Sequence, residues 1–367
     1  MTDRQGAASS EIAIVGIVGA GVMGCGIAQV ALEAGHEVVL HDVDDSALGR
    51  AQDRIADGLA KRASRVVADP AEIDAWVAER AGGLRTSDVL EQLGDEVDAV
   101  IETALESLEL KQTIFRTLAA VAAPSVILAT NTSALSIASI ASATSHPERV
   151  LGLHFFNPAP LMRLVEVIPG PATDPRVADA GERLVTGWGK VAVRSADAPG
   201  FIVNRVNRPF TLEALRILEA GQASVETIDA AMRDAGFPLG PFELMDLTGI
   251  DVTFAASTAI WEGLGHPDRL RPSPIQEARI AAGALGRKTG EGFYRYLDGK
   301  RGTPAVGAPT DHGIEAAAIR KRILAAIDAE AGLLASEHVA SEADIDRAMR
   351  LGANHPQGPF ERARHPK

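Results

Sequence analysis

The chain has 367 residues, of which 46% are hydrophobic and 23% are charged, as is usual for a globular protein of two or three domains. A formal net charge of −13 argues against a general nucleic-acid binder and against binding to an anionic membrane surface, and the single cysteine, Cys25, excludes an intrachain disulfide. Residues 1–10 are polar and lack an apolar segment, so we expect a disordered tail, no signal peptide, and a cytoplasmic protein.

The first predicted elements are a buried strand and a helix joined by a glycine-rich turn. Residues 12–18 form a continuous apolar run, the motif G-x-G-x-x-G follows it at once, and a helical segment continues over 27–34. In this context the glycines allow a tight turn, the approach of a pyrophosphate and close packing of the helix on the strand. We therefore expect a dinucleotide cofactor. The residues expected to contact it are Gly19, Gly21, Val22, Met23 and Gly24.

A second apolar strand over residues 37–41 ends at Asp42, 18 residues after Gly24. An acid at this spacing hydrogen-bonds the ribose 2′-hydroxyl and repels a 2′-phosphate. The predicted cofactor is therefore NAD and not NADP.

A long helical region over 47–80 carries three neighbouring basic residues, Lys61, Arg62 and Arg65. They are candidates for contacts with the phosphates of a large anionic substrate. The alternative is a solvated helix face.

Strand and helix patterns then alternate as far as residue 196, which predicts a Rossmann-type, doubly wound, mostly parallel α/β sheet. In such sheets ligands bind beyond the carboxyl ends of the strands, where Asn131, Ser133 and His154 fall. Strands are expected over 97–102, 125–130, 151–155, 161–168 and 190–194, and helices over 108–121 and 177–186.

His154 and Glu166 both lie in apolar, strand-like runs, where a lone charge is costly unless the two side chains meet. An imidazole held by a carboxylate has a defined tautomer and can take a proton from a substrate hydroxyl. The alternative is a buried structural histidine beside a structural acid.

The pattern becomes helical from residue 197, which predicts an all-α second domain over 197–298. Residues 223–233 recur as 340–350, 117 positions later, and Gly-Pro-Phe-Glu at 240–243 recurs at 358–361. Such a repeat indicates a duplication. We therefore expect a Gly/Pro-rich linker over 299–313 and a truncated second copy of the helical domain over 314–367.

Six motifs together resemble the L-3-hydroxyacyl-CoA dehydrogenase family, over residues 11 to about 297, and the chain looks like its 3-hydroxybutyryl-CoA dehydrogenases. The motifs are the glycine loop continued to Ala28, Glu106 with Leu110-Lys111, Asn131-Thr132-Ser133, Gly152 to Pro158, Pro199 to Arg205, and Leu285 to Tyr294. The resemblance implies NAD-dependent oxidation of (S)-3-hydroxyacyl-CoA to 3-ketoacyl-CoA, as in fatty acid β-oxidation or its reversal.

The resemblance also implies roles for individual residues. His154 matches the catalytic base and Glu166 its orienting carboxylate, while Ser133 and Asn204 match a polar pair near the substrate hydroxyl and thioester. Ser133 could instead belong to a helix cap, and Asn204 could be a structural amide. Residues expected at the cofactor are Glu106, Lys111 and Asn131, and Asn157 is expected at the substrate.

Other functions stay open from the sequence. One is oxidation of 3-hydroxyadipyl-CoA in aromatic-acid breakdown, another is oxidation of a non-CoA 3-hydroxy acid such as L-gulonate, and a third is cofactor binding without turnover. No metal is expected. The second helical copy could act as an internal partner, giving a pseudo-dimer, or could leave a homodimer intact.

Overall fold

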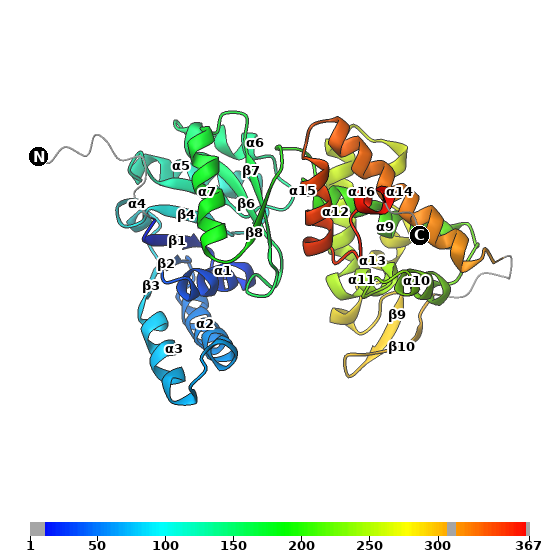
Figure 1. Cartoon of the computed structure of the whole chain (residues 1–367), viewed down its shortest axis with the longest axis horizontal. Coiled ribbons are helices and arrows are strands. Elements are labelled where there is room, and N and C mark those ends of the chain that lie inside the picture. Colours follow the sequence, from blue (N-terminus) through cyan, green and yellow to red (C-terminus); the bar gives the residue numbers. More distant parts are fainter. Residues whose placement is uncertain (1–11, 307–312, 365–367) are drawn as a thin grey trace, which may run out of the picture. The chain divides into compact units, whose positions relative to one another are not determined.

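The computed structural model describes residues 12–306 and 313–364, which form two compact units that divide between Asp197 and Ala198 (Figure 1). The tail predicted over 1–10 lies outside the described residues. The first unit is a sheet with helices on both faces, and the second is largely helical.

The sheet of the first unit has eight strands in the order β3-β2-β1-β4-β5-β6-β7-β8. Neighbouring strands pair in parallel except β6 and β7, which are antiparallel. The predicted doubly wound, mostly parallel sheet is confirmed. The strands are β1 (Ile14–Val18), β2 (Glu37–His41), β3 (Leu84–Ser87), β4 (Ala99–Glu102), β5 (Ile127–Thr130), β6 (Val150–Phe155), β7 (Leu164–Pro169) and β8 (Val191–Arg194).

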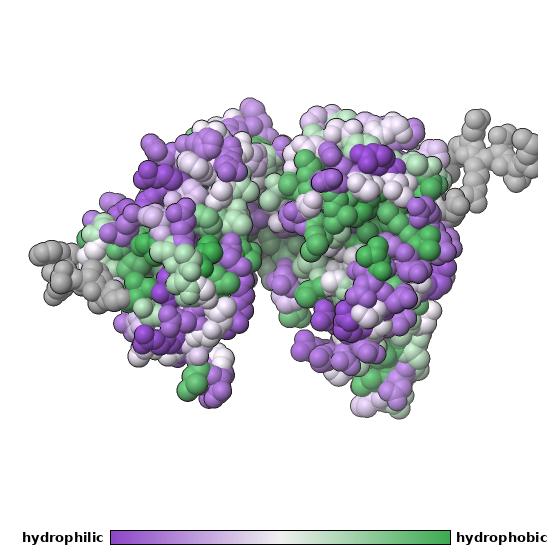
Figure 2. Space-filling model, turned by 180° about the vertical axis from the view of Figure 1, so that it is seen from behind, coloured by the Kyte–Doolittle hydropathy of each residue, from purple (hydrophilic) through white to green (hydrophobic). Residues whose placement is uncertain are grey.

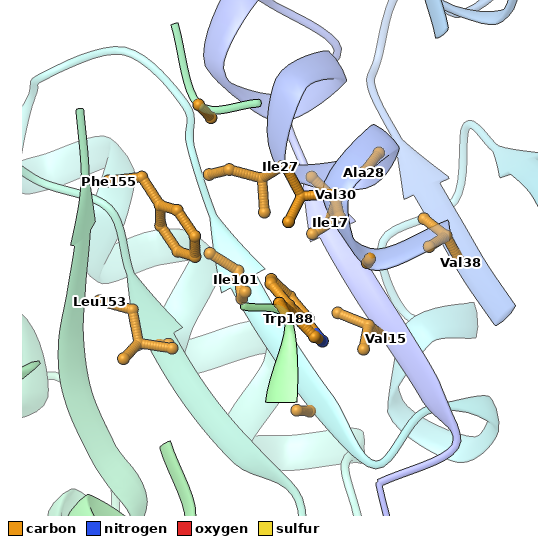
Figure 3. Close-up of a cluster of buried hydrophobic side chains, with 14 of the residues drawn as sticks. Val15, Ile17, Ile27, Ala28, Val30, Val38, Ile101, Leu153, Phe155 and Trp188 are labelled. Carbon is orange, nitrogen blue, oxygen red and sulfur yellow. The ribbon is translucent and has the colours of Figure 1, made fainter. Parts of the chain in front are cut away.

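The core of this unit lies between the sheet and α1, where Ile17 and Ile101 of the strands meet Ile27 and Val30 of the helix (Figure 3). Strand β3 was not predicted, because its sequence, Leu-Arg-Thr-Ser, has no apolar run. It forms a partly exposed edge of the sheet. The helices are α1 (Val22–Glu33), α2 (Asp45–Val66), α3 (Ile73–Gly82), α4 (Gln92–Glu96), α5 (Leu108–Val121), α6 (Ile137–Ala141) and α7 (Pro175–Gly187).

The second unit contains two successive groups of helices, as the repeat predicts. The first group is α8 (Val203–Val206), α9 (Arg208–Glu219), α10 (Val225–Asp234), α11 (Pro241–Thr248), α12 (Ile250–Gly263) and α13 (Pro274–Ala281). The second group is α14 (Ala316–Ser336), α15 (Glu342–Gly352) and α16 (Pro359–Arg364).

A β-hairpin corrects the expectation of an all-α unit and of a linker that begins at residue 299. Strands β9 (Tyr294–Leu297) and β10 (Lys300–Pro304) pair antiparallel. The turn residues Asp298 and Gly299 have φ of 50° and 73°, and Asp-Gly is the dipeptide that favours a two-residue hairpin turn. The predicted linker therefore contains a strand.

The same capping arrangement occurs in both helical copies. Asp229 Oδ1 accepts the amide of Phe242 at 2.9 Å, and Asp346 Oδ1 accepts that of Phe360 at 2.8 Å. Each aspartate leaves no room for a side chain at the glycine before the helix, since a Cβ on Gly240 would lie 2.3 Å from an atom of Asp229. The repeated Gly-Pro-Phe-Glu thus preserves a buried helix start.

Burial raises the pKa of the Asp229 carboxyl from 3.8 to about 7. Between those values the folded chain holds a proton that the unfolded chain releases, so the free energy of unfolding decreases as pH rises. The full difference corresponds to about 4 kcal/mol. We expect Asp229→Asn to reduce this loss of stability between pH 4.5 and 7.5, measured by denaturant unfolding.

The matched control is Asp234→Asn, at the exposed end of the same helix α10. It should keep the pH dependence of the parent chain. Equal slopes in the two variants would contradict the assignment to Asp229.

Candidate functional site

The glycine loop joins β1 to α1 with a geometry suited to a phosphate. Gly19 has φ of 104°, and a Cβ on Gly24 would lie 1.8 Å from the Gly19 carbonyl oxygen, so helix and turn pack too closely for a side chain. A Cβ on Gly21, the residue before α1, would meet nothing within 4 Å. The loop therefore has open space beside the first backbone amides of α1. Free amides at a helix N-terminus favour the binding of a pyrophosphate.

Asp42 lies directly after β2 and is held beside this loop. Its Oδ2 accepts the amide of Ala20 at 2.8 Å, and its Oδ1 accepts that of Asp44 at 3.1 Å. The two hydrogen bonds orient the carboxylate at the end of the strand, in the place from which an acid contacts the ribose of a bound dinucleotide.

Three exposed apolar side chains lie just beyond the carboxyl ends of strands. Val22 begins α1 after β1, Val43 follows β2 and Leu105 follows β4, with exposures of 59%, 87% and 79%. Figure 2 shows such hydrophobic residues among hydrophilic ones on the displayed face of each unit. An apolar lining beside a few polar groups is typical of a cofactor site, so the residues present fit a dinucleotide.

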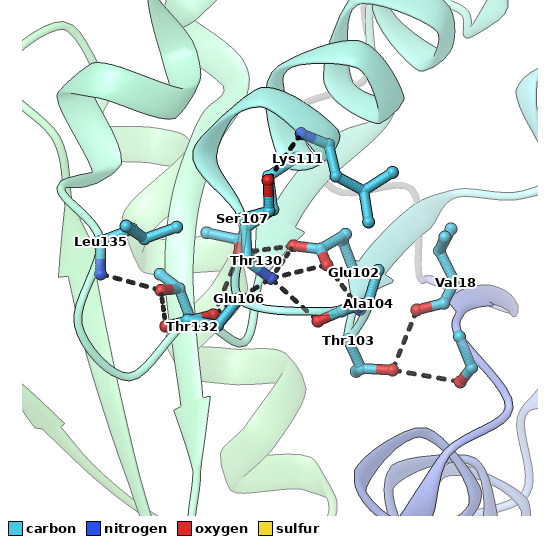
Figure 4. A network of polar contacts seen from close by, with 12 residues as sticks. Val18, Glu102, Thr103, Ala104, Glu106, Ser107, Lys111, Thr130, Thr132 and Leu135 are labelled. Atoms are coloured by element: carbon cyan, nitrogen blue, oxygen red, sulfur yellow. Dashed lines mark hydrogen bonds and ion pairs between the residues drawn. The ribbon is translucent and has the colours of Figure 1, made fainter. Parts of the chain in front are cut away.

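A buried polar cluster lies beneath the next two strand ends (Figure 4). Lys111 Nζ contacts the two carboxylate oxygens of Glu102 at 2.8 and 3.0 Å, and Thr130 Oγ1 donates to the same carboxylate at 2.7 Å. The side chains of Lys111 and Glu102 are 1% and 0% exposed. Lys111, predicted at the cofactor, is therefore placed where it supports the loops. Sequence reasoning missed Glu102, although an acid that ends the apolar run Ala-Val-Ile was a usable signal.

Glu106 ties the loop after β5 to the loop after β4. Its Oε1 accepts from Thr132 Oγ1 at 2.6 Å and from the amides of Ser133 and Ala134 at 3.0 and 3.2 Å, while Oε2 lies 3.4 Å from Lys111 Nζ. Ser133 itself is exposed. The structure thus brings together Glu106, Ser133 and the cluster below them.

Asn131 connects this region to the strand that carries the histidine. Its Oδ1 accepts the amide of Phe155, the residue after His154, at 2.8 Å. The carboxyl ends of β5 and β6 are therefore joined by a side chain as well as by the sheet.

His154 and Glu166 meet across the antiparallel strands β6 and β7, where they are register partners. His154 Nδ1 lies 2.6 Å from Glu166 Oε2, and the two side chains are 7% and 0% exposed. Because a carboxylate accepts, Nδ1 is the nitrogen that carries hydrogen in the neutral ring, and Nε2 is then its basic nitrogen. The geometry suits proton transfer at Nε2.

The loop that follows His154 carries the exposed Asn157 and is held by a lysine that sequence reasoning missed. Lys190 Nζ donates to the carbonyls of Ala159 and Met162 at 2.6 and 2.9 Å. Burial lowers the pKa of Lys190 to about 8. Its signal in the sequence, one lysine before a short strand, is too common to be specific.

The remaining predicted residues belong to helices α2 and α8. Lys61, Arg62 and Arg65 are exposed on α2, and Arg62 Nε lies 3.3 Å from Glu33 Oε2. Asn204 belongs to α8 of the second unit and is partly exposed.

Comparison with known families matches both units. The model described as 3-hydroxyacyl-CoA dehydrogenase, NAD binding domain, matches residues 14–198. The model described as 3-hydroxyacyl-CoA dehydrogenase, C-terminal domain, matches residues 200–296 and 319–365, in agreement with a second, shorter copy.

Individual relatives agree with this family match. The chain is 43% identical over 304 residues to the 3-hydroxyadipyl-CoA dehydrogenase of Escherichia coli (strain K12), an alignment that covers 82% of this chain but 62% of the relative. It is 43% identical over 288 residues to the 3-hydroxybutyryl-CoA dehydrogenase of Bradyrhizobium diazoefficiens, covering 78% and 96% of the two chains. The chain thus spans less than two thirds of the length of the E. coli relative.

A solved structure has the same fold. The crystal structure of 3-hydroxybutyryl-CoA dehydrogenase from Escherichia coli K12 is similar with a TM-score of 0.85 and 35% identity, covering 96% of this chain and 91% of that one. The predicted family, with its NAD-binding domain, is confirmed. The chain belongs to the 3-hydroxyacyl-CoA dehydrogenase family.

Proposed function

We propose that this chain oxidises (S)-3-hydroxyacyl-CoA, of the 3-hydroxybutyryl type, to 3-ketoacyl-CoA with NAD, and that His154 is the general base. The observation that carries the proposal is the 2.6 Å contact of His154 Nδ1 with Glu166 Oε2. It lies at the carboxyl end of β6, and the glycine loop and Asp42 follow the carboxyl ends of the parallel strands β1 and β2 in the same sheet.

The chemistry divides between cofactor and protein. NAD, when bound, supplies an acceptor for the hydride that leaves C3 of the substrate. His154 Nε2 takes the proton of the C3 hydroxyl, so the oxygen keeps the O–H electron pair and the C3 carbonyl forms. Glu166 stabilises the imidazolium that results. In the reverse direction His154 returns the proton.

Other side chains hold the substrate in this proposal. Ser133, presented by the loop that Glu106 binds, contacts the substrate hydroxyl. Asn157 contributes from the loop after β6. Glu106 and Asn131 act on the cofactor side, with Lys111 beneath them.

Two classes of acyl group are candidates, because two relatives that differ in acyl group are equally similar to this chain. A 3-hydroxyadipyl-CoA dehydrogenase and a 3-hydroxybutyryl-CoA dehydrogenase are each 43% identical to this chain, so an acyl chain with a terminal carboxylate is the second candidate. Among residues 12–306 and 313–364, none of the helices has the length and apolar character needed to cross a membrane. A cytoplasmic location stays a prediction.

The first test is NADH consumption by the purified chain with acetoacetyl-CoA, 3-ketoadipyl-CoA and free acetoacetate. We expect turnover with a thioester and none with the free acid. Turnover with free 3-keto acids alone would replace the proposal with a non-CoA dehydrogenase. The ratio of kcat/KM for acetoacetyl-CoA to that for 3-ketoadipyl-CoA decides between the two classes of acyl group.

His154→Gln should lower kcat at least about a hundredfold, because the general base is lost. NADH binding, followed by fluorescence, should be kept, since His154 lies in a different strand from the glycine loop. The matched control is His146→Gln, an exposed histidine before β6, which should leave kcat unchanged. An unchanged kcat in His154→Gln would remove the assignment.

Asp42→Ala should narrow the preference for NADH over NADPH, because the carboxylate that repels a 2′-phosphate is gone. The ratio of kcat/KM for the two cofactors measures the effect, with Asp45→Ala as the control from the start of α2. If the ratio is the same in both variants, another residue discriminates the ribose.

Simultaneous replacement of Lys61, Arg62 and Arg65 by alanine should raise KM for acetoacetyl-CoA roughly tenfold at low salt, with the increase shrinking as salt screens the phosphates. KM for NADH should not change. Arg116→Ala, on the exposed side of α5, is the control. An unaltered thioester KM would leave these residues as a solvated helix face.

A further inference from the structure

Residues 156–163 connect β6 to β7, the two strands that carry His154 and Glu166. These two residues are partners only in the register in which the strands pair. Side chains alternate between the faces of a sheet, so a slip of one residue would turn Glu166 to the opposite face, away from the histidine. Whatever fixes the register of β6 and β7 therefore also fixes the contact between His154 and Glu166.

The length of this connection does not set the register. It exceeds the loops of about two to five residues in which the turn type decides how two strands of a hairpin pair. Within it the amides of Leu161 and Met162 both donate to the carbonyl oxygen of Pro158, at 3.0 Å each. The middle of the connection is therefore a compact turn, which still has to be held against the sheet.

Lys190, the residue before β8, binds this turn. Its Nζ donates to the carbonyl oxygens of Ala159 at 2.6 Å and Met162 at 2.9 Å. Lys190 is only 8% exposed. Hydrogen bonds from a charged donor are roughly twice as strong as neutral ones, so one ammonium group holds the turn at two of its carbonyls.

The backbone of Lys190 is fixed relative to β7. Its amide donates to the carbonyl of Val185 in α7 at 3.1 Å, and the next amide, that of Val191, donates to the carbonyl of Arg163 at 2.7 Å. Strand β8 then pairs in parallel with β7. Lys190 thus joins the turn to the strand that carries Glu166.

The same turn packs against α1, the helix that begins at the glycine loop. A Cβ on Gly26 of this helix would lie 3.1 Å from Pro160 Cδ and 3.2 Å from Ala159 Cβ, and Ala159 is buried. Packing limits how closely the turn approaches the helix. The hydrogen bonds of Lys190 define which residues of the turn face the lysine.

We propose that Lys190 is a positioning residue for the reaction, which fixes the turn between β6 and β7 and so keeps Glu166 opposite His154. Glu33 of α1 and Arg62 of α2 are charged neighbours of Lys190, and they pair with each other at 3.3 Å between Oε2 and Nε. The ammonium is therefore left to bind the carbonyls. The effect on turnover rests on the proposed function, whereas the effect on the contact itself does not.

The first experiment observes the contact by NMR in the full-length chain. The proton that His154 Nδ1 donates to Glu166 should give a resonance far downfield, which is absent in His154→Gln. Lys190→Met removes the donors at nearly the same side-chain length and should shift or weaken this resonance. Lys300→Met, on the exposed strand β10, should leave it unchanged. An unaltered resonance in a folded Lys190→Met chain would overturn the proposal.

The second experiment measures kcat for the reduction of acetoacetyl-CoA. Lys190→Met should lower kcat roughly tenfold to a hundredfold, because a small misplacement of a catalytic group is costly, and should leave the Kd for NADH unchanged. Combined with His154→Gln the loss should not multiply, since Lys190 acts through a pair that is already broken. Multiplied losses would assign Lys190 another role and overturn the proposal. A parent chain that turns over no thioester would contradict the proposed function instead, and the NMR comparison would still decide this inference.

Lys190→Gln separates hydrogen bonding from the filling of space. Glutamine keeps an N–H donor, so kcat should exceed that of Lys190→Met. A lysine that only filled a buried space would give the reverse order, because a buried amide without partners is more costly than a thioether. Should the methionine variant not fold, Lys190→Gln is compared with Lys300→Gln by NMR and by kcat. Equality of these two variants in both measurements would overturn the proposal.

Discussion

The contact between His154 and Glu166 depends on the antiparallel pairing of β6 with β7. Directly opposed residues on an antiparallel pair have Cβ atoms about 5 Å apart, and the register of β6 and β7 makes these two residues partners. Both strands are buried, so neither side chain is solvated as it would be at the surface. Each group therefore relies on the other, and the loss of one partner from a buried pair costs about 3–5 kcal/mol. The contact of Nδ1 with Glu166 also fixes the orientation of the imidazole ring, so Nε2 is the nitrogen left to exchange a proton.

The rest of the site is assembled by carboxylates that bind loops. Glu106 accepts hydrogen bonds from the segment around Ser133, and Asp42 accepts an amide of the glycine loop. Beneath them Glu102 and Lys111 form a buried pair that joins β4 to α5. Loops on the carboxyl edge of a sheet are free to move unless side chains hold them. Here their positions follow from charge-assisted hydrogen bonds, which are stronger than neutral ones.

The helical unit uses one capping device twice and completes it in two ways. In the first copy the second oxygen of Asp229 accepts from the hydroxyl of Tyr294, on the hairpin, at 2.8 Å. In the second copy the second oxygen of Asp346 accepts from the guanidinium of Arg364 at 2.9 Å. Arg364 stands 118 positions after Asp246, which in the first copy accepts the amides of Phe293 and Tyr294 at the start of the hairpin. The second copy thus satisfies its buried aspartate without a hairpin.

The sequence by itself determined the features that depend on local spacing. The strand, glycine loop and acid of the cofactor region are consecutive, and apolar periodicity predicts the sheet and helices around them. The duplication is likewise visible as repeated residues. The hairpin of β9 and β10 was not predicted, because the exposed strand β10 begins with two charged residues and has no apolar pattern. Its Asp-Gly turn was nevertheless a local signal. Tertiary structure alone decided the partners of buried charges: Glu102 with Lys111, Lys190 with the carbonyls of Ala159 and Met162, and Arg205 with Glu330. Such contacts join residues far apart in the chain, and their energy depends on burial and distance, which no local pattern specifies.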